Sequence, residues 1–104
     1  SGMEVTVPLF GSDVQGATPE DILALYHKIY DGSPLVRVAN ADEGGFLSAG
    51  SMTGKDSMEI SVYGNANRMI LVARYDNLGK GASGAAVECL NILLGADPTS
   101  NLVV

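Results

Sequence analysis

A glycine-rich joint between an apolar strand and a small-residue helix constrains this chain more than any other part of it. Residues 69–73 form a continuous apolar run, Met-Ile-Leu-Val-Ala, which is typical of a strand covered on both faces. Residues 85–93 then place Ala, Cys and Leu at helical spacing, and Gly95 followed by Pro98 predicts the end of that helix. The joint at residues 76–84 carries three glycines and one lysine. We therefore expect a tight strand-to-helix turn there.

Two interpretations of this turn stay open on the residues alone. Glycine allows another backbone or a ligand to come close, and the first free amides of a helix attract negative charge. The same glycines also suit a plain tight corner, with Gly84 and the alanines after it letting the helix lie close against a sheet. A phosphate-binding loop is excluded, because Gly79-Lys80-Gly81 lacks both the first glycine and the hydroxyl that the motif requires.

Length and charge bound the classes of protein that remain. A chain of 104 residues with 46% hydrophobic content forms one domain with a single modest core. The formal net charge of −6 argues against a nucleic-acid partner, since no basic stripe is present to meet phosphates. Cys89 is the only cysteine, which excludes an internal disulfide. With no apolar run long enough to cross a bilayer, we expect a cytoplasmic protein with no membrane partner.

The order of the expected elements predicts an α+β fold. Alternating apolar residues at the start and short apolar runs later predict strands at residues 3–10, 35–38, 46–50, 58–63 and 68–75, and helical spacing predicts helices at 18–31 and 85–94. The first strand should bury one face. Gly64-Asn65-Ala66-Asn67 has the chemistry of a hairpin loop. Short connections favour a mostly antiparallel sheet with helices packed on one face.

The residues that most often carry chemistry do not form a complete catalytic set. His27 lies off the apolar stripe of its helix and is expected to face solvent. Cys89 is expected to lie on the inner face of the last helix as a small buried hydrophobe. The acids Asp42, Glu43, Asp56 and Glu59 match no calcium or zinc spacing, so we predict no metal site and no catalytic residue.

Three segments of the chain resemble a known family. They are residues 76–86 running into 90–95, residues 4–9 before a Thr-Pro-Glu-Asp helix start, and residues 58–65. Together they resemble the C-terminal part of N-acetyl-gamma-glutamyl-phosphate reductase, which has a C-terminal domain of the semialdehyde dehydrogenase and glyceraldehyde-3-phosphate dehydrogenase type. The resemblance covers nearly the whole chain. It implies that residues 1–104 are a single domain from the rear of a two-domain reductase of arginine biosynthesis.

The family reaction implied by this resemblance reduces an acyl phosphate to an aldehyde through a cysteine thioester, with NADPH as the reductant. In the family the nucleotide fingerprint, the nucleophilic cysteine and the histidine belong to sequence that would precede Met3. Cys89 and His27 lie outside the matching motifs and take no catalytic role. The isolated chain is therefore expected to bind NADPH weakly or not at all and to be inactive.

The resemblance carries over a cofactor-binding edge. The residue at Asn77 is placed to hold the nicotinamide carboxamide, since its amide is both donor and acceptor. Gly81, Ala82 and Gly84 would allow close backbone approach, while Lys80 either reaches a phosphate or caps the surface. The family also implies a homo-oligomer, because its C-terminal domain carries the subunit contact.

Two other interpretations stay open. Aspartate-semialdehyde dehydrogenase shares the fold and the thioester chemistry and differs in substrate. A second alternative is an autonomous, non-catalytic α+β assembly or ligand-binding module. A chain that opens directly on a strand favours a fragment of something longer, and the sequence before codon three would decide between a fragment and a module.

Overall fold

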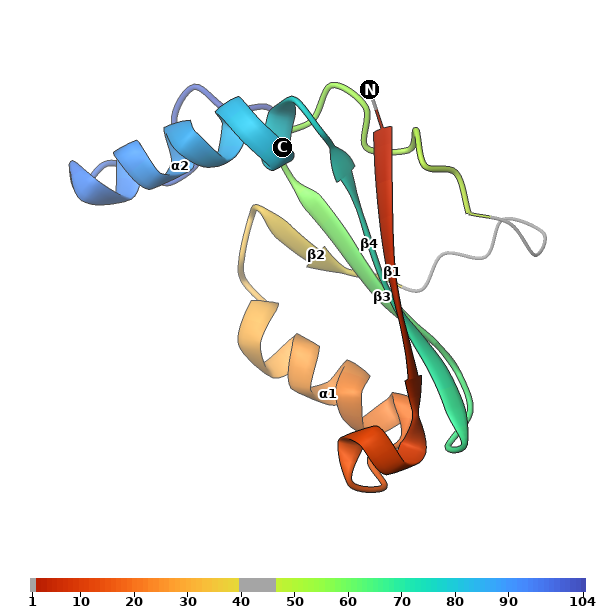
Figure 1. The fold of residues 1–104 in the computed structure, drawn as a ribbon. Helices are drawn as coiled ribbons and strands as arrows, with labels where there is room; N and C mark the ends of the chain where they lie inside the picture. The colour runs from red at the N-terminus through yellow and green to blue at the C-terminus, as the bar shows by residue number, and fades with distance from the viewer. Residues whose placement is uncertain (1, 40–46) are drawn as a thin grey trace.

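The fold is a four-stranded mixed sheet with two helices, as the computed structural model shows for residues 2–39 and 47–104 (Figure 1). The elements in chain order are β1 (Gly2–Phe10), the 3-10 turn η1 (Gly11–Val14), α1 (Pro19–Tyr30), β2 (Val36–Val38), β3 (Met58–Gly64), β4 (Arg68–Asp76), the π-helical turn η2 (Gly79–Ser83) and α2 (Gly84–Leu93). The strand order is β1-β4-β3-β2. Pairs β1/β4 and β3/β4 are antiparallel, and β2/β3 is parallel. The predicted α+β fold with a mostly antiparallel sheet is confirmed.

The register of the sheet decides which side chains share a face. Val5 lies opposite Ala73, which in turn lies opposite Ile60, so these three side chains point the same way. They line a shallow pocket together with Tyr26 of α1, so this is the face that α1 approaches. Their neighbours along each strand point to the opposite face. α1 itself packs on β2 and β3 and leaves β1 uncovered on that side (Figure 1).

Helix α1 begins where the sequence predicts. Thr18 is its N-cap, and the Thr18 Oγ1 accepts a hydrogen bond from the Asp21 amide at 3.2 Å. The Asp21 carboxylate accepts one in return from the Thr18 amide at 2.9 Å, which completes a reciprocal cap with Pro19 in the first turn. The helix ends at Tyr30, one residue before the predicted stop.

The buried apolar core is small and lies entirely within one stretch of the chain. Its members, each no more than 8% exposed, are Leu35, Met52, Ile60, Val62, Met69 and Val72. They come from β3, β4 and the segments that flank β2 and β3. The sheet and the loop packed on it therefore form the core, while the residues after β4 contribute no large buried hydrophobic side chain among those the structure describes.

Several predictions about the sheet need correction. β1 alternates as expected, but Met3, Val5 and Val7 remain 40–45% exposed, because α1 does not extend over this edge strand. Residues 47–50 form no strand and instead enter a series of turns. Phe46 of that predicted strand, and the acids Asp42 and Glu43, lie outside the described residues.

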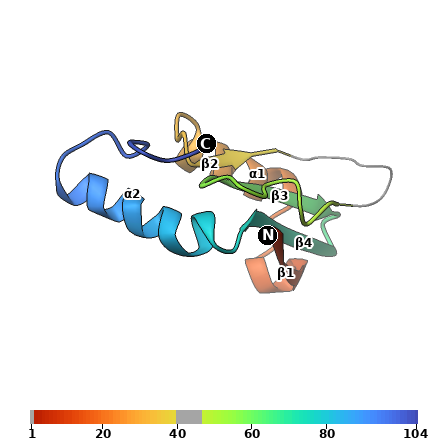
Figure 2. The same ribbon diagram turned by 90° about the horizontal axis from the view of Figure 1, so that it is seen from above.

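The last helix does not return to the sheet. α2 runs outward from the end of β4, as both views show (Figures 1 and 2). The prediction that Cys89 is buried is therefore wrong: its side chain is exposed because the sheet does not reach this part of α2. Leu93, expected on the same face as Cys89, is 82% exposed, and Leu90 is 51% exposed.

The C-terminal tail folds back from the end of α2 toward the sheet (Figure 2). Gly95 takes the left-handed conformation that ends the helix, with φ +70°. The Asn91 Nδ2 donates hydrogen bonds to the carbonyls of Pro98 and Ser100, at 3.1 and 2.8 Å. Val103 then exchanges hydrogen bonds with Asp56, just before β3, so the tail does tuck back, although it forms no strand.

Candidate functional site

The turn between β4 and α2 is held in place, or braced, by hydrogen bonds to the carboxylate of Asp76. Asp76 ends β4 in register with Gly2 of β1. Its carboxylate accepts hydrogen bonds from the Leu78 amide at 2.8 Å and the Gly79 amide at 3.1 Å, which is the pattern of an aspartate-initiated turn. A third bond comes from the Gly54 amide at 2.7 Å, so the loop before β3 is tied to the same carboxylate.

These three amides also set the charge state of the carboxylate. Hydrogen bonds from the backbone amides of Gly54, Leu78 and Gly79 favour the ionised form and lower the pKa of Asp76 to about 2. The side chain is therefore an anion at neutral pH. It is also enclosed, since Asp76 is only 6% exposed.

The π-helical turn η2 forms the part of the joint that leads into α2. The Ser83 amide and the Ser83 hydroxyl both donate to the Leu78 carbonyl, at 3.0 and 2.8 Å. The Gly84 amide donates to the Gly79 carbonyl. Wide turns of this kind recur at functional sites because they displace the backbone from regular helical positions.

The predicted cofactor-binding residues divide into two groups. Asn77, Gly81 and Ala82 lie on the exposed side of the turn. Lys80 and Gly84 are instead engaged inside the fold. The Lys80 ammonium pairs with the Glu88 carboxylate one turn into α2, and its side chain is only 13% exposed.

Gly84 is required by a close approach. A Cβ at this position would lie 2.3 Å from the Asp56 Oδ1 and 2.7 Å from the Gly79 carbonyl, so only glycine fits. Asp56 also binds the tail through Val103. The glycine thus brings the start of α2 against the loop before β3, and not against the sheet as the packing interpretation of the sequence expects.

Sequence reasoning missed the two carboxylates that brace this turn. Asp76 sits directly after a strand and three residues before a glycine, which is a readable signal for an aspartate-initiated turn. Asp56 carries no comparable signal, because its partners Gly84 and Val103 are distant in sequence.

A separate ionic cluster lies on the sheet face opposite α1. Glu59 receives hydrogen bonds from Arg74 and Arg37, each at 2.5 Å, and Arg74 also donates to the Ser48 carbonyl at 3.1 Å. Arg74 is 1% exposed, whereas the Arg37 side chain is 63% exposed. Burial raises the pKa of Glu59, but the hydrogen bonds and the positive charges of Arg37 and Arg74 together outweigh it, so the net shift of the pKa is downward. Both arginines pair with the same carboxylate, which indicates a structural role for the cluster.

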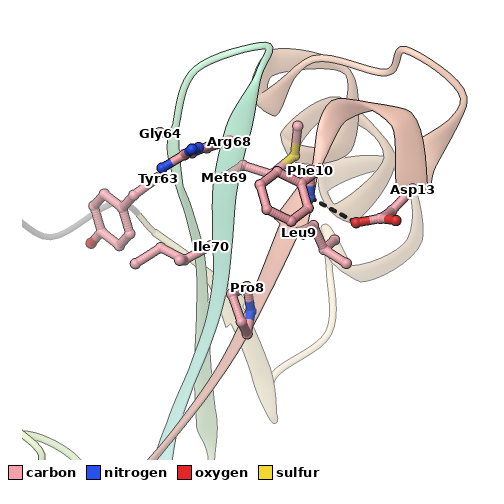
Figure 3. Close-up of a pocket in the computed structure, with 9 residues that line it drawn as sticks. All are labelled: Pro8, Leu9, Phe10, Asp13, Tyr63, Gly64, Arg68, Met69 and Ile70. Carbon is pink, nitrogen blue, oxygen red and sulfur yellow. Dashed lines mark hydrogen bonds between the residues drawn. The ribbon is translucent and has the colours of Figure 1, made fainter.

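A pocket lies at the other end of the sheet (Figure 3). It is an open groove of about 620 Å³ at the β3/β4 hairpin, lined by Pro8, Leu9, Phe10, Asp13, Tyr63, Gly64, Arg68, Met69 and Ile70. The Arg68 guanidinium lies 5.6 Å from the centre of the Phe10 ring. The lining is mainly apolar, so the groove suits another apolar surface better than a charged ligand.

His27 and the potential metal-ligating residues form no cluster in the described residues. His27 is exposed as predicted, and its Nδ1 lies 2.9 Å from the Asp31 carboxylate. No group of three or more potential metal ligands gathers among residues 2–39 and 47–104. Within the same residues, neither helix has the length and apolar character needed to span a bilayer.

Comparison with known proteins distinguishes residues 1–77 from the rest of the chain. The family described as semialdehyde dehydrogenase, dimerisation domain, matches residues 1–77, which end at the braced turn. This chain belongs to that family. The turn residues 78–84, α2 and the tail lie beyond the matched region.

Individual relatives extend the similarity over α2. The chain is 42% identical over 101 residues to the N-acetyl-gamma-glutamyl-phosphate reductase of Allorhizobium ampelinum, covering 91% of this chain and 33% of that protein. The enzyme of the same name from Brucella ovis is 42% identical over 103 residues, covering 90% of this chain and 32% of that protein. The match lies in the C-terminal part of those relatives. The chain thus spans about a third of the length of the curated relatives it matches.

Proposed function

We propose that this chain is the C-terminal part of an N-acetyl-gamma-glutamyl-phosphate reductase and that its Asn77 turn forms one edge of the NADPH site. The identity to reductases of that name over nine-tenths of the chain supports this substrate over aspartate semialdehyde. A biosynthetic reductase of this kind would act in the cytoplasm, in arginine biosynthesis. The catalytic thiol and the nucleotide-binding domain would be supplied by the rest of the polypeptide.

The residues of the turn fit a nicotinamide carboxamide. Asn77 is exposed, and its amide offers both the donor and the acceptor that a carboxamide needs. Gly81 and Ala82 are exposed beside it and present backbone without bulky side chains. NADPH, when bound, supplies the reducing equivalents. The residues of this chain would orient the ring and narrow its access to water.

Lys80 and Gly84 would act in this site less directly. The Lys80 ammonium is already paired with Glu88, so a cofactor phosphate would have to compete with that carboxylate. Gly84 would act by allowing α2 to lie against Asp56, which fixes the position of the turn that carries Asn77. The cofactor edge we propose therefore consists of Asn77, Gly81 and Ala82 at the surface, with Lys80 and Gly84 beneath them.

The exposed apolar ridge of α2 supports a contact with the rest of the polypeptide. Leu90, Ile92, Leu93 and Leu94 are all at least 51% exposed. Several exposed large hydrophobic residues within one short segment are typical of an interaction surface. We propose that they pack on the nucleotide-binding domain of the same chain, which would bring the Asn77 turn to the cofactor.

The experiment is an NADPH titration of the intact reductase that carries this chain, followed by the change in cofactor fluorescence. Asn77→Ala removes one desolvated amide contact worth about 1 to 3 kcal/mol, so binding should weaken by roughly 5- to 150-fold. Asn67→Ala, in the hairpin loop at the far end of the sheet, is the matched control and should bind as the parent does. Unchanged affinity of Asn77→Ala would remove the turn from the cofactor site.

The family description also supports self-association, and we propose a second copy as the occupant of the groove at the β3/β4 hairpin. Phe10 and Ile70 are 56% and 36% exposed there and lie, by strand alternation, on the face opposite α1. Phe10→Ser with Ile70→Ser should convert the intact protein to monomer in sedimentation velocity. Leu25→Ser, on the exposed side of α1, should not. The reverse pattern would place the subunit contact on the α1 side.

A further inference from the structure

The carboxylate of Asp76, at the end of β4, binds both the Asn77 turn and the loop before β3. The Asp76 Oδ1 accepts hydrogen bonds from the amides of Leu78 and Gly79, and the Oδ2 accepts one from the Gly54 amide. The two oxygens therefore have separate partners. Oδ1 shapes the turn, whereas Oδ2 ties the turn to the loop before β3.

This arrangement fixes the backbone of Asn77 without covering its side chain. The residue before it is locked in the β4 ladder, and the residue after it donates its amide to Asp76 and accepts from Ser83 at its carbonyl. Asn77 itself is exposed. A side chain held this way needs no reordering of its backbone when a ligand arrives, which lowers the entropic cost of binding.

We infer that Asp76 is the positioning residue of the cofactor-side turn, holding Asn77 at the place where it meets the carboxamide of a nicotinamide dinucleotide. This inference rests on the proposed function. Asp76 does not touch the cofactor in this arrangement. Asp76 acts through the Leu78 and Gly79 amides. Cofactor binding should therefore survive removal of the Asp76 charge but not displacement of its Oδ1 acceptor.

Three substitutions separate geometry from charge. Asp76→Asn keeps an acceptor oxygen at the Oδ1 position but offers a donor group to the Gly54 amide, so the turn persists while the loop connection is lost. Asp76→Glu keeps the charge but moves the acceptor by one methylene and breaks the turn. Asp76→Ala removes both oxygens.

Asp97 provides a matched control in the tail. Its Oδ1 accepts from the Thr99 amide at 2.8 Å and the Thr99 hydroxyl at 2.6 Å, so it forms a local turn of the same kind on an exposed segment. These bonds also lower the pKa of Asp97. Asp97→Ala should therefore show what the loss of such a turn does away from the cofactor edge.

The experiment measures the NADPH dissociation constant of the intact reductase by fluorescence titration, with thermal melting of each variant in parallel. We expect Asp76→Glu and Asp76→Ala to bind at least about tenfold more weakly, Asp76→Asn to stay within about threefold, and Asp97→Ala to be unchanged. Both Asp76→Asn and Asp76→Ala should melt at a lower temperature than the parent. If Asp76→Ala fails to fold, the NADPH affinity of Asp76→Glu still tests the positioning role.

The outcomes separate this inference from the function on which it rests. If Asn77→Ala weakens binding while Asp76→Glu binds like the parent, the positioning role is overturned and the cofactor edge stands. If Asn77→Ala has no effect, the cofactor edge itself is wrong. A loss of binding in Asp76→Asn equal to that in Asp76→Glu would overturn the inference that Asp76 acts through the Leu78 and Gly79 amides, because Asn keeps the Oδ1 acceptor for both of them.

Discussion

The body of the molecule, residues 2–77, and its arm, residues 78–104, differ in how many large hydrophobic side chains they bury. Among residues 2–39 and 47–104, the buried core hydrophobics all belong to the body. The arm instead leaves Leu78, Leu90, Ile92, Leu93 and Leu94 between 51% and 82% exposed. The family match also ends at residue 77. The difference supports our proposal that the arm packs on another part of the intact polypeptide.

The largest loss of stability is expected when the buried Glu59–Arg74 ion pair of the body is removed. Glu59→Ala leaves the Arg74 guanidinium buried without its carboxylate, which typically costs about 3 to 5 kcal/mol. Arg37→Ala removes the exposed partner of the same carboxylate and should cost less than about 1 kcal/mol. Urea unfolding of the two variants measures both values. Equal small losses would show that the buried pair does not hold the body together.

The junction of body and arm is tested by adding one methyl group. In an ordinary helix, Gly→Ala stabilises by about 1 kcal/mol. At Gly84 the added Cβ would lie 2.3 Å from the Asp56 Oδ1, so Gly84→Ala should instead destabilise by about 1 to 3 kcal/mol. Gly50→Ala, whose Cβ would meet only side-chain atoms at 3.6 Å or more, should stay within about 0.5 kcal/mol. A stabilising Gly84→Ala would mean that α2 is free of the loop before β3.

Acid should loosen the same junction through Asp76. Its pKa in the folded protein is about 2, below the ordinary value of 3.8. The unfolded chain therefore binds the proton first as the pH falls, so the stabilisation is complete above about pH 4 and is lost between pH 3.8 and 2. Asp76→Asn should flatten the pH dependence of the urea midpoint over that interval. An identical pH profile in the variant would exclude Asp76 as a source of the acid sensitivity.

The smallest effect is expected in the arm. Leu93 is 82% exposed, so Leu93→Ser should change the free energy of unfolding of this chain by no more than about 0.5 kcal/mol. In the intact reductase, where we propose that the α2 ridge is covered, the same change should cost more. The comparison requires chemical unfolding of both forms. Equal effects in the two would mean that Leu93 stays in solvent throughout.

The sequence predicts those parts of this fold that depend on neighbours along the chain. The cap at Thr18, the hairpin at residues 64–67 and the stop at Gly95 are local, and each is confirmed. The order and type of the main elements follow from the same local signals. The turn at residues 76–84 is also found where the glycines predict it.

Burial could not be predicted in the same way, because it depends on what covers a surface. The alternation in β1 and the helical spacing around Cys89 are correct as patterns, yet both elements remain exposed. An amphipathic pattern records that a face will be buried, but it does not say by which part of a polypeptide. Asp56 was missed for a related reason, since its role depends on contacts with Gly84 and Val103 that only folding creates.

The most direct test of the account is amide hydrogen exchange measured on this chain alone and on the intact reductase, with and without NADPH. Amides of β3 and β4 should be protected in every sample. Amides of α2, a helix of ten residues, should exchange quickly in the isolated chain and slow in the intact protein, and those of the Asn77 turn should slow further with NADPH. Equal protection of α2 in both proteins, and no effect of NADPH on the turn, would contradict the account.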